Sequence, residues 1–254
     1  MEAARIDPRL PEGAPAPAPV LQLRGVERRY GAFRPALGAL DLALGRGEFL
    51  VVQGPGGCGK SVLLRLMAGL ERPSTGSVHI AGEDLAALRA RARAHMRRAL
   101  GYLPAGAGLL LQRSVLHNVA LAPWVAGNER EEGLRRARAA LALVGIDPDR
   151  QGDQPVGQLP AGERQCVAVA RAIANRPALL LLDDLIAPLD SVRADRVLNV
   201  LGQFADAGIA IVATQRADAG AVAPLPAPWP TRARVLRLSD GVPVLPAADP
   251  AAPA

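Results

Sequence analysis

The stretch GPGGCGKS, at residues 54–61, most constrains how this chain can fold. It follows the apolar run EFLVVQ (48–53) and precedes the helical pattern VLLRLMAGL (62–70). Strand, loop and helix in this order match the pattern G-x-x-x-x-G-K-[ST] in the context that the pattern requires. The glycines let the backbone curl so that successive N–H groups face phosphate oxygens, and the helix adds its positive dipole end. The sequence therefore predicts a nucleotide phosphate site here.

Two side chains at the end of this loop supply the expected chemistry. Lys60 would neutralise the β- and γ-phosphates, and the Ser61 hydroxyl would ligate Mg²⁺. A chance glycine-rich turn would not be expected to combine the strand, the lysine and the serine. The predicted nucleotide-binding residues of this segment are Gly54, Pro55, Gly56, Gly57, Cys58, Gly59, Lys60, Ser61 and Val62.

The other apolar runs indicate the class of fold. LLLL (179–182) and IAIVAT (209–214) have the length of buried strands, and helical patterns separate them. Such an order favours a parallel sheet with crossover helices. VLQLRGV (20–26) and LDLAL (40–44) instead alternate apolar and polar residues, as half-exposed antiparallel strands do. We therefore predict an α/β fold with a parallel sheet core and an antiparallel β subdomain.

The middle of the chain reads as helical. Leu134, Ala137, Leu141 and Val144 recur at helical spacing with arginines on the opposite face. This amphipathic helix lies in a mostly helical region, which we expect to form a helical subdomain at about residues 101–165.

Proline and alanine dominate both ends of the sequence, which we interpret as tails over residues 1–19 and 246–254. A similar tract at 223–230 reads as a surface loop insertion. The single folded domain is then expected over residues 20–245. At 254 residues and 50% hydrophobic content, a chain of this kind can build one sizeable core.

Composition also limits the location and the partners. Two cysteines without ligand spacing indicate a reducing compartment, and we find neither a signal peptide nor an apolar run long enough to span a bilayer. We expect a cytoplasmic protein. The net charge of +6 includes the arginine-rich run 89–98, which could serve nucleic acid, an anionic membrane or a partner, or could be a solvated helix face. No aromatic residues interleave with these arginines, which argues against a groove for single-stranded nucleic acid.

Two aspartates follow the apolar run 179–182 directly. Asp183 suits the carboxylate that holds Mg²⁺ through water. Asp184 is the natural candidate for polarising the water that attacks the γ-phosphate. A lone Asp after a strand is often only a cap, so the functional interpretation depends on its pairing with the glycine-rich loop.

Several blocks, in one order, resemble the ATP-binding subunits of ABC transporters. They are the phosphate loop, LPAGERQCVAVARAIANRPALLLLDD (159–184), APLD (187–190) and IAIVATQ (209–215). The resemblance covers about residues 20–244 and is greatest to the cell-division branch, FtsE. It implies a P-loop NTPase fold, ATP and Mg²⁺ as ligands, and a head-to-tail dimer in which the signature of one subunit covers the phosphates held by the other.

The resemblance also implies roles for single residues. Tyr30 matches the aromatic residue that stacks on adenine, and the alternative is an ordinary core tyrosine. Gly162 belongs to the signature that covers the phosphates. Asp190 matches the aspartate of the dimer-contact loop.

Four positions depart from the family pattern, and two of them lie in loops. Ala105 stands where the family has a glutamine that contacts Mg²⁺ and the attacking water, and Gln112 lies farther along the chain. The signature reads LPAGE, in which Pro160 removes a hydroxyl and an N–H, and Ala161 adds a methyl group to a position of close phosphate approach. Because proline is tolerated at a helix start, the fold should survive.

The other two departures affect the predicted catalytic residues. Asp184 replaces a glutamate, which draws the carboxylate back by one methylene, and a displacement near 1 Å can cost roughly 10²-fold in rate. Gln215 replaces a histidine after the last strand; it can hydrogen-bond the γ-phosphate but has no protonatable imidazole. Binding is therefore expected to persist, while turnover is expected to be impaired.

Three functions follow from these residues. The first is an ATPase that couples ATP binding and slow hydrolysis to an integral membrane partner, either FtsX-like or a permease, on the inner membrane face. The second is a non-hydrolysing, ATP-gated interaction subunit. The third is a DNA-associated repair ATPase, which ranks last because the chain lacks the coiled-coil or zinc insertions of those proteins, so we expect no nucleic-acid partner. The dimer could pair two identical or two unlike subunits.

Overall fold

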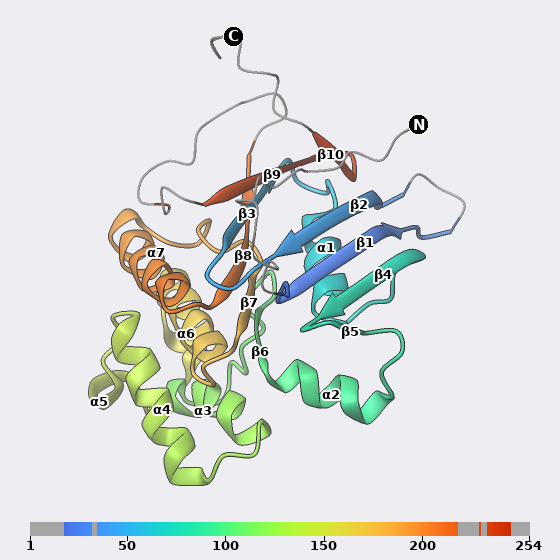
Figure 1. The fold of residues 1–254 in the computed structure, drawn as a ribbon. Helices are drawn as coiled ribbons and strands as arrows, with labels where there is room; N and C mark the ends of the chain where they lie inside the picture. Colours follow the sequence, from blue (N-terminus) through green and yellow to red (C-terminus); the bar gives the residue numbers. More distant parts are fainter. Residues whose placement is uncertain (1–17, 32–34, 218–228, 230–232, 245–254) are drawn as a thin grey trace.

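The computed structural model describes residues 18–31, 35–217, 229 and 233–244. The predicted tails, apart from residues 18 and 19, and most of the tract at 223–230 lie outside the described residues. Within the described part, two β-sheets and the helices around them pack together (Figure 1).

A six-stranded sheet forms the centre of the structure, in the order β10-β9-β3-β8-β7-β6. Five of its strands are parallel, and only β10 pairs antiparallel, with β9. The predicted parallel sheet is therefore confirmed. Its strands are β3 (Phe49–Gly54), β6 (Leu100–Leu103), β7 (Leu179–Leu182), β8 (Ala210–Arg216), β9 (Arg234–Ser239) and β10 (Val242–Val244).

Alternate residues of the central strands face two different cores. Leu50 and Val52 of β3 pack with helix α1 (Lys60–Met67) and the antiparallel sheet. Phe49 and Val51 face the opposite side, where helices α6 (Ala161–Ile173) and α7 (Ser191–Asp206) pack. The two-residue period of the strand thus explains why β3 is apolar from Phe49 to Val52, since neither of its faces meets water.

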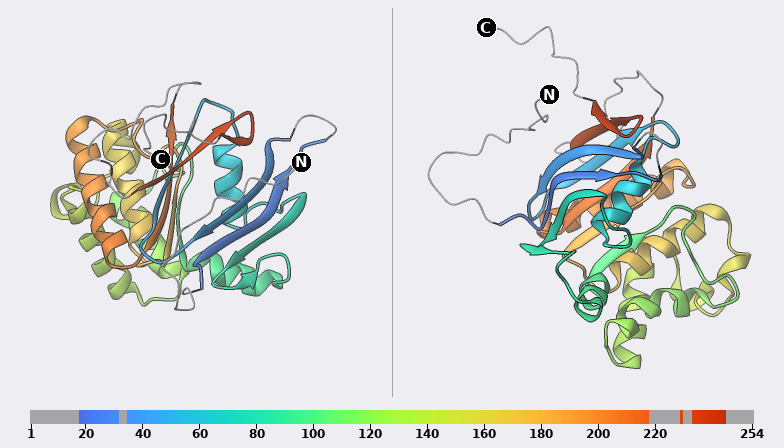
Figure 2. Two further views of the ribbon diagram at one scale, coloured as in Figure 1. Left: turned by 45° about the horizontal axis from the view of Figure 1, so that its top comes forward. Right: turned by 90° about the vertical axis from the view of Figure 1, so that its right-hand side faces the viewer.

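The second sheet is antiparallel, with the order β2-β1-β4-β5. It lies on the other side of α1 from the central sheet, so α1 is enclosed between the two sheets (Figures 1 and 2). The alternating patterns predicted this pairing for β1 and β2 correctly. The strands are β1 (Leu21–Arg28), β2 (Leu37–Leu44), β4 (Thr75–Ile80) and β5 (Glu83–Asp84).

Helices α6 and α7 cover the remaining face of the central sheet. The structure assigns the following helices to the described residues: α2 (Ala90–Arg98), α3 (Val115–Val125), α4 (Arg130–Leu143), α5 (Pro148–Gln151), the 3-10 turn η1 (Val156–Gln158), α6 (Ala161–Ile173) and α7 (Ser191–Asp206). The amphipathic pattern predicted α4 correctly, and α2 has no buried residue, as a solvated arginine-rich helix should. None of the described helices combines the length and apolar character needed to cross a bilayer.

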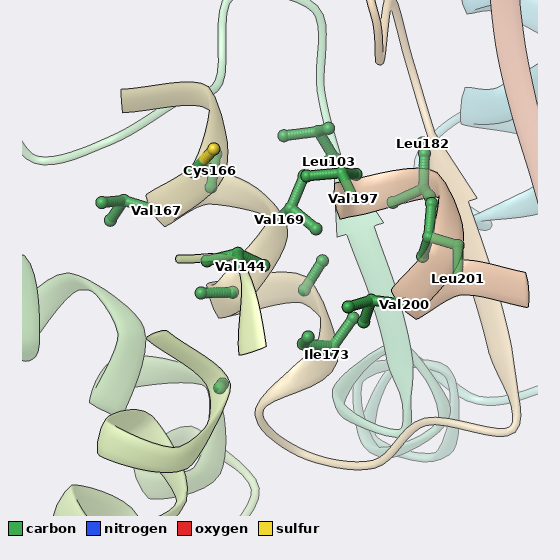
Figure 3. Close-up of a cluster of buried hydrophobic side chains, with 14 of the residues drawn as sticks. Leu103, Val144, Cys166, Val167, Val169, Ile173, Leu182, Val197, Val200 and Leu201 are labelled. Atoms are coloured by element: carbon green, nitrogen blue, oxygen red, sulfur yellow. The ribbon is translucent and has the colours of Figure 1, made fainter. Parts of the chain in front are cut away.

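Helix α6 joins the helical layer to the central sheet. Figure 3 shows Val169 and Ile173 of α6 among side chains of β6, β7 and α7, while Val144, just after α4, lies near α6. Cys166 belongs to this cluster and has no exposed surface, and burial raises the pKa of its thiol to about 11. Cys166 is therefore a core residue.

One buried amide positions the segment between β6 and α3. The Asn118 side chain has no exposed surface, and its Oδ1 accepts from the Leu110 N–H at 2.8 Å. Its Nδ2 donates to the carbonyls of Leu110, Arg113 and Ser114 at 3.0–3.3 Å. All of these bonds stay within one turn of helix α3 and the loop before it, so Asn118 holds that loop against the helix.

We expect Asn118→Ala to lower the free energy of unfolding by about 2–3 kcal/mol, because it removes four hydrogen bonds that hold the loop before α3. Urea denaturation measures the change. The control is Gln203→Ala, on the exposed side of α7, which should stay within about 0.5 kcal/mol of wild type. Equal stability of the two variants would contradict the role given to Asn118.

Candidate nucleotide-binding site

The glycine-rich loop connects the carboxyl end of β3 to the first turn of α1. Two of its glycines are required by close backbone contacts. A Cβ atom on Gly54 would lie 2.2 Å from the Leu238 carbonyl oxygen, and one on Gly59 would lie 2.4 Å from that of Ala36. Gly59 also has a φ of +99° as the residue that caps α1. The loop can therefore hold this shape only with glycine at these two positions.

The charged end of Lys60 folds back over the loop. Its Nζ donates to the carbonyl oxygens of Gly54 and Pro55, each at 2.7 Å, and lies 3.6 Å from the Cys58 sulfur. The Cys58 side chain is buried against the core, so it contributes packing and its backbone to the site. The ammonium group is thus held at the loop where a phosphate would lie.

A hollow of about 140 Å³ lies at the amino end of α1. The predicted ligands Lys60 and Ser61 line it, and Gly56 and Gly57 are exposed beside the charged amine. Its lining residues are Ala36, Gly57, Gly59, Lys60, Ser61 and Val62. Backbone N–H groups, a helix amino end and one ammonium group form a site that fits phosphate.

The parallel register brings the predicted aspartates to the same edge of the sheet. Leu182 of β7 pairs with Ala213 of β8, so Asp183 comes level with Thr214. Val52 of β3 also pairs with Thr214. Since neighbouring strands lie about 4.8 Å apart, Asp183 is about two strand spacings from the strand that carries the phosphate loop.

Asp183 is buried, with 4% of its surface exposed. Its N–H donates to the Leu103 carbonyl at 2.8 Å, and its Oδ1 accepts from the Thr214 hydroxyl at 2.7 Å. Burial and the negative charge of Asp183 raise the pKa of Tyr102 on the neighbouring strand. Asp183 is thus a buried carboxylate at the same sheet edge as the phosphate loop, and its role at Mg²⁺ remains a prediction.

The donor set around the loop fits Mg²⁺. Ser61 offers a hydroxyl and Asp183 a carboxylate, and this ion prefers oxygen ligands. Mg²⁺ is usually held by one or two protein groups together with phosphates and water. The described residues contain no cluster of three or more His, Cys, Asp or Glu side chains that could hold a metal ion.

Asp184 has a φ of +49°, a left-handed conformation that is uncommon for residues other than glycine. Two side chains from other elements hold its backbone. The Thr214 hydroxyl accepts from its N–H at 2.8 Å, and the buried Gln165 amide donates to the carbonyls of Asp184 and Leu185 at 3.3 and 3.0 Å. Neither Thr214 nor Gln165 was assigned a role from the sequence, although both lie inside the family blocks.

Gln215 is bound to a residue that sequence analysis missed. The Gln53 amide donates to the Gln215 Oε1 atom at 3.0 Å, and Gln53 is 3% exposed. The two residues pair across β3 and β8. A polar residue in the otherwise apolar run EFLVVQ was the signal for this contact.

The LPAGE segment forms the amino end of α6. Pro160 caps the helix and is exposed, as is Ala161, so the helix begins despite the proline, as predicted. Gly162 is half-buried next to Glu163, whose carboxylate pairs with Arg193 at 3.1 Å. This pairing connects the signature helix to α7.

Asp190 is the N-terminal cap of α7. Its carboxylate accepts from the Arg193 N–H at 2.9 Å and also pairs with the Arg193 side chain. These hydrogen bonds lower the pKa of Asp190. The helix-capping role is therefore present in this structure.

The loop after β6 contains Ala105, which is exposed and carries no polar side-chain atom. Arg171 of α6 holds this loop by donating to the carbonyls of Ala107 and Gly108 at 2.6 and 2.8 Å. Gln112 is exposed farther along the same segment. The loop is therefore present, but residue 105 does not offer the glutamine side chain of the family pattern.

Tyr30 lies at the end of β1, beside the carboxyl end of α1. Its hydroxyl donates to Glu71, and the Arg28 guanidinium lies 4.6 Å from the centroid of its ring. The ring is 43% exposed, so the alternative of a core tyrosine does not hold. These contacts connect Tyr30 to the far end of α1, and stacking on adenine remains a prediction.

Comparison with known proteins agrees with this geometry. The ABC transporter family model matches residues 37–187. The cell-division ATP-binding protein FtsE of Escherichia coli K12 is 34% identical over 193 residues, which cover 76% of this chain and 86% of FtsE. The methionine import ATP-binding protein MetN of Brucella abortus is 36% identical over 184 residues, which cover 72% of this chain and 49% of MetN. The chain thus spans about half the length of this import relative.

Solved structures give the same result. The dimeric ATP-binding cassette MJ0796, in a post-hydrolysis state bound to ADP and Pi, superposes with a TM-score of 0.76 at 26% identity. The match covers 88% of this chain and 96% of that cassette. From its sequence, its family match and its fold, this chain belongs to the ABC transporter family of ATP-binding proteins.

Proposed function

We propose that this protein is an FtsE-like ATP-binding subunit of an ABC-type membrane complex, which binds Mg²⁺-ATP and hydrolyses it slowly. One observation carries the proposal: the phosphate loop and Asp183 lie at the same sheet edge, in register through β8. Lys60, Ser61 and Asp183 support it, since they are the residues predicted to contact the phosphates or Mg²⁺, although Val62 replaces the threonine that is usual in the family. The predicted γ-phosphate contacts are the altered ones.

In this proposal the N–H groups of the loop and Lys60 bind the phosphates, while Ser61 and Asp183 hold Mg²⁺. Mg²⁺ supplies positive charge that stabilises the negative charge of the transferred phosphoryl group. Asp184 accepts a proton from the attacking water, and its left-handed backbone sets where its short side chain can reach. The Gln215 amide would contact the γ-phosphate.

Slow turnover is proposed because four positions on the γ-phosphate side differ from the family pattern: Ala105, the LPAGE signature, Asp184 and Gln215. Ala105 cannot bind water or metal, Pro160 offers no N–H, and Ala161 adds a methyl group. Asp184 is one methylene shorter than glutamate. The alternative function is an interaction subunit in which ATP binding alone promotes dimerisation or docking.

The partner in this proposal is an integral membrane subunit, FtsX-like or a permease, on the cytoplasmic face of the membrane. An apolar groove of about 470 Å³ between α2, β6 and α3 would receive a segment of it. Leu70 and Val125 line the groove and are 48% and 57% exposed, and Arg97 and Arg98 also line it. A dimer of such subunits, identical or unlike, is proposed by analogy with the dimeric cassette structure.

Lys60→Ala should weaken binding of a fluorescent ATP analogue by roughly 10- to 100-fold, the effect of losing about 1.5–3 kcal/mol of charged hydrogen bonding. Arg46→Ala is the control, since Arg46 is exposed just before the opposite end of β3. Equal affinity of Lys60→Ala and wild type would contradict the phosphate site.

Asp184→Glu should increase the rate of phosphate release, by up to about 10²-fold, because it restores the missing methylene. Asp195→Glu makes the same change at an exposed position of α7 and should have no effect. Tight ATP binding with negligible release in wild type would favour the non-hydrolysing alternative. Wild-type turnover within about tenfold of ordinary family members would contradict impaired catalysis.

Val125→Asp should reduce cosedimentation of the protein with membrane vesicles from its source cells by roughly tenfold, since a buried apolar contact contributes about 1.5 kcal/mol or more. The control is Leu143→Asp, an exposed leucine on α4 that does not line the groove. ATP affinity should be unchanged in both variants. Equal losses in the two variants would contradict docking in this groove.

A further inference from the structure

Thr214 lies at the centre of the site, but neither the family resemblance nor the sequence assigned it a function. It belongs to β8, is 1% exposed, and stands between β3 and β7. Its hydroxyl oxygen lies 2.7 Å from the Asp183 Oδ1 atom and 2.8 Å from the Asp184 nitrogen. One side chain thus contacts both of the aspartates to which we assign metal binding and water activation.

The direction of both hydrogen bonds follows from chemistry alone. A backbone N–H can only donate, so the Thr214 oxygen accepts from Asp184. An ionised carboxylate can only accept, so the Thr214 hydrogen goes to the Asp183 Oδ1 atom. Both hydrogen bonds therefore run in one direction, from the Asp184 N–H to the Thr214 hydroxyl and from that hydroxyl to the negatively charged Asp183 carboxylate. The bond to the carboxylate is thus charge-assisted.

This bond leaves one oxygen of Asp183 for a ligand. Oδ1 is occupied by Thr214, and no described residue donates a hydrogen bond to Oδ2. Because the carboxylate is buried and bound through one oxygen, its rotation about χ2 is restricted. Groups that hold a metal-binding side chain from behind commonly alter metal affinity by about 10- to 100-fold when removed.

The second bond fixes the backbone that carries Asp184. A left-handed residue persists where its surroundings over-determine it. Here Thr214 holds the N–H side of Asp184, and Gln165 holds its carbonyl side. Without the hydroxyl, the N–H would lose its partner and the turn would be free to relax toward an ordinary conformation.

We propose that Thr214 is a positioning residue that sets Asp183 for Mg²⁺ and Asp184 for the attacking water through one hydroxyl. The inference rests on the proposed function of the same site. A purely structural role for Thr214, in which it only links β8 to β7, would affect stability without changing the Mg²⁺ dependence of ATP binding.

The test compares Thr214→Val, which keeps the shape but removes the hydroxyl, with Thr214→Ser, which keeps the hydroxyl. Binding of a fluorescent ATP analogue is titrated in EDTA and then with increasing Mg²⁺. Thr75→Val repeats the valine substitution at an exposed site on β4. Urea denaturation of every variant records stability separately.

We expect Thr214→Val to raise the Mg²⁺ concentration for half-maximal binding by about 10-fold or more, with unchanged affinity in EDTA. Its phosphate release should fall as well. Thr214→Ser and Thr75→Val should match wild type in both binding assays. If Thr214→Val does not fold, Thr214→Ala replaces it in the same comparison with Thr214→Ser.

Two outcomes overturn the proposal in distinguishable ways. A Thr214→Val protein of reduced stability but wild-type Mg²⁺ dependence would show a structural tie and overturn this inference alone. A wild-type protein that binds no ATP analogue, with or without Mg²⁺, would overturn the proposed function and this inference with it.

Discussion

Parallel backbone pairing of β3, β8 and β7 is the constraint on which the rest of the structure depends. It places Val52 and Asp183 on either side of Thr214, so the phosphate loop and the acidic residues meet at one edge. Parallel strands need crossover helices, and these bury both faces of the sheet. The site is therefore built from strand ends that the core holds rigid.

Strand β8 connects the two halves of the site. Thr214 contacts the aspartates after β7, and the next residue, Gln215, pairs with Gln53 at the end of β3. Because β8 lies between β3 and β7 in the sheet, its residues can contact both neighbours. A shift of β8 relative to either neighbour would change both sets of contacts together.

The contacts that hold the elements expected near the γ-phosphate are formed, even where the polar side chains of these elements differ from the family pattern. Arg171 holds the loop that contains Ala105, and Glu163 pairs with Arg193, which also binds Asp190. The differences thus remove side-chain chemistry without removing the elements that would carry it. Because the supporting elements are kept while the polar side chains differ, we expect ATP to be bound well and cleaved slowly.

The sequence alone determined strands β1, β2, β3, β7 and β8, helix α4 and the glycine-rich loop, because apolar periodicity and glycine spacing are local signals. It also predicted the pairing class of both sheets. Tertiary structure alone decided that Thr214 contacts both aspartates, that Gln165 holds Asp184, and that Tyr30 contacts Glu71. These contacts join residues far apart in the chain, and only strand register and helix packing bring such residues within hydrogen-bond distance.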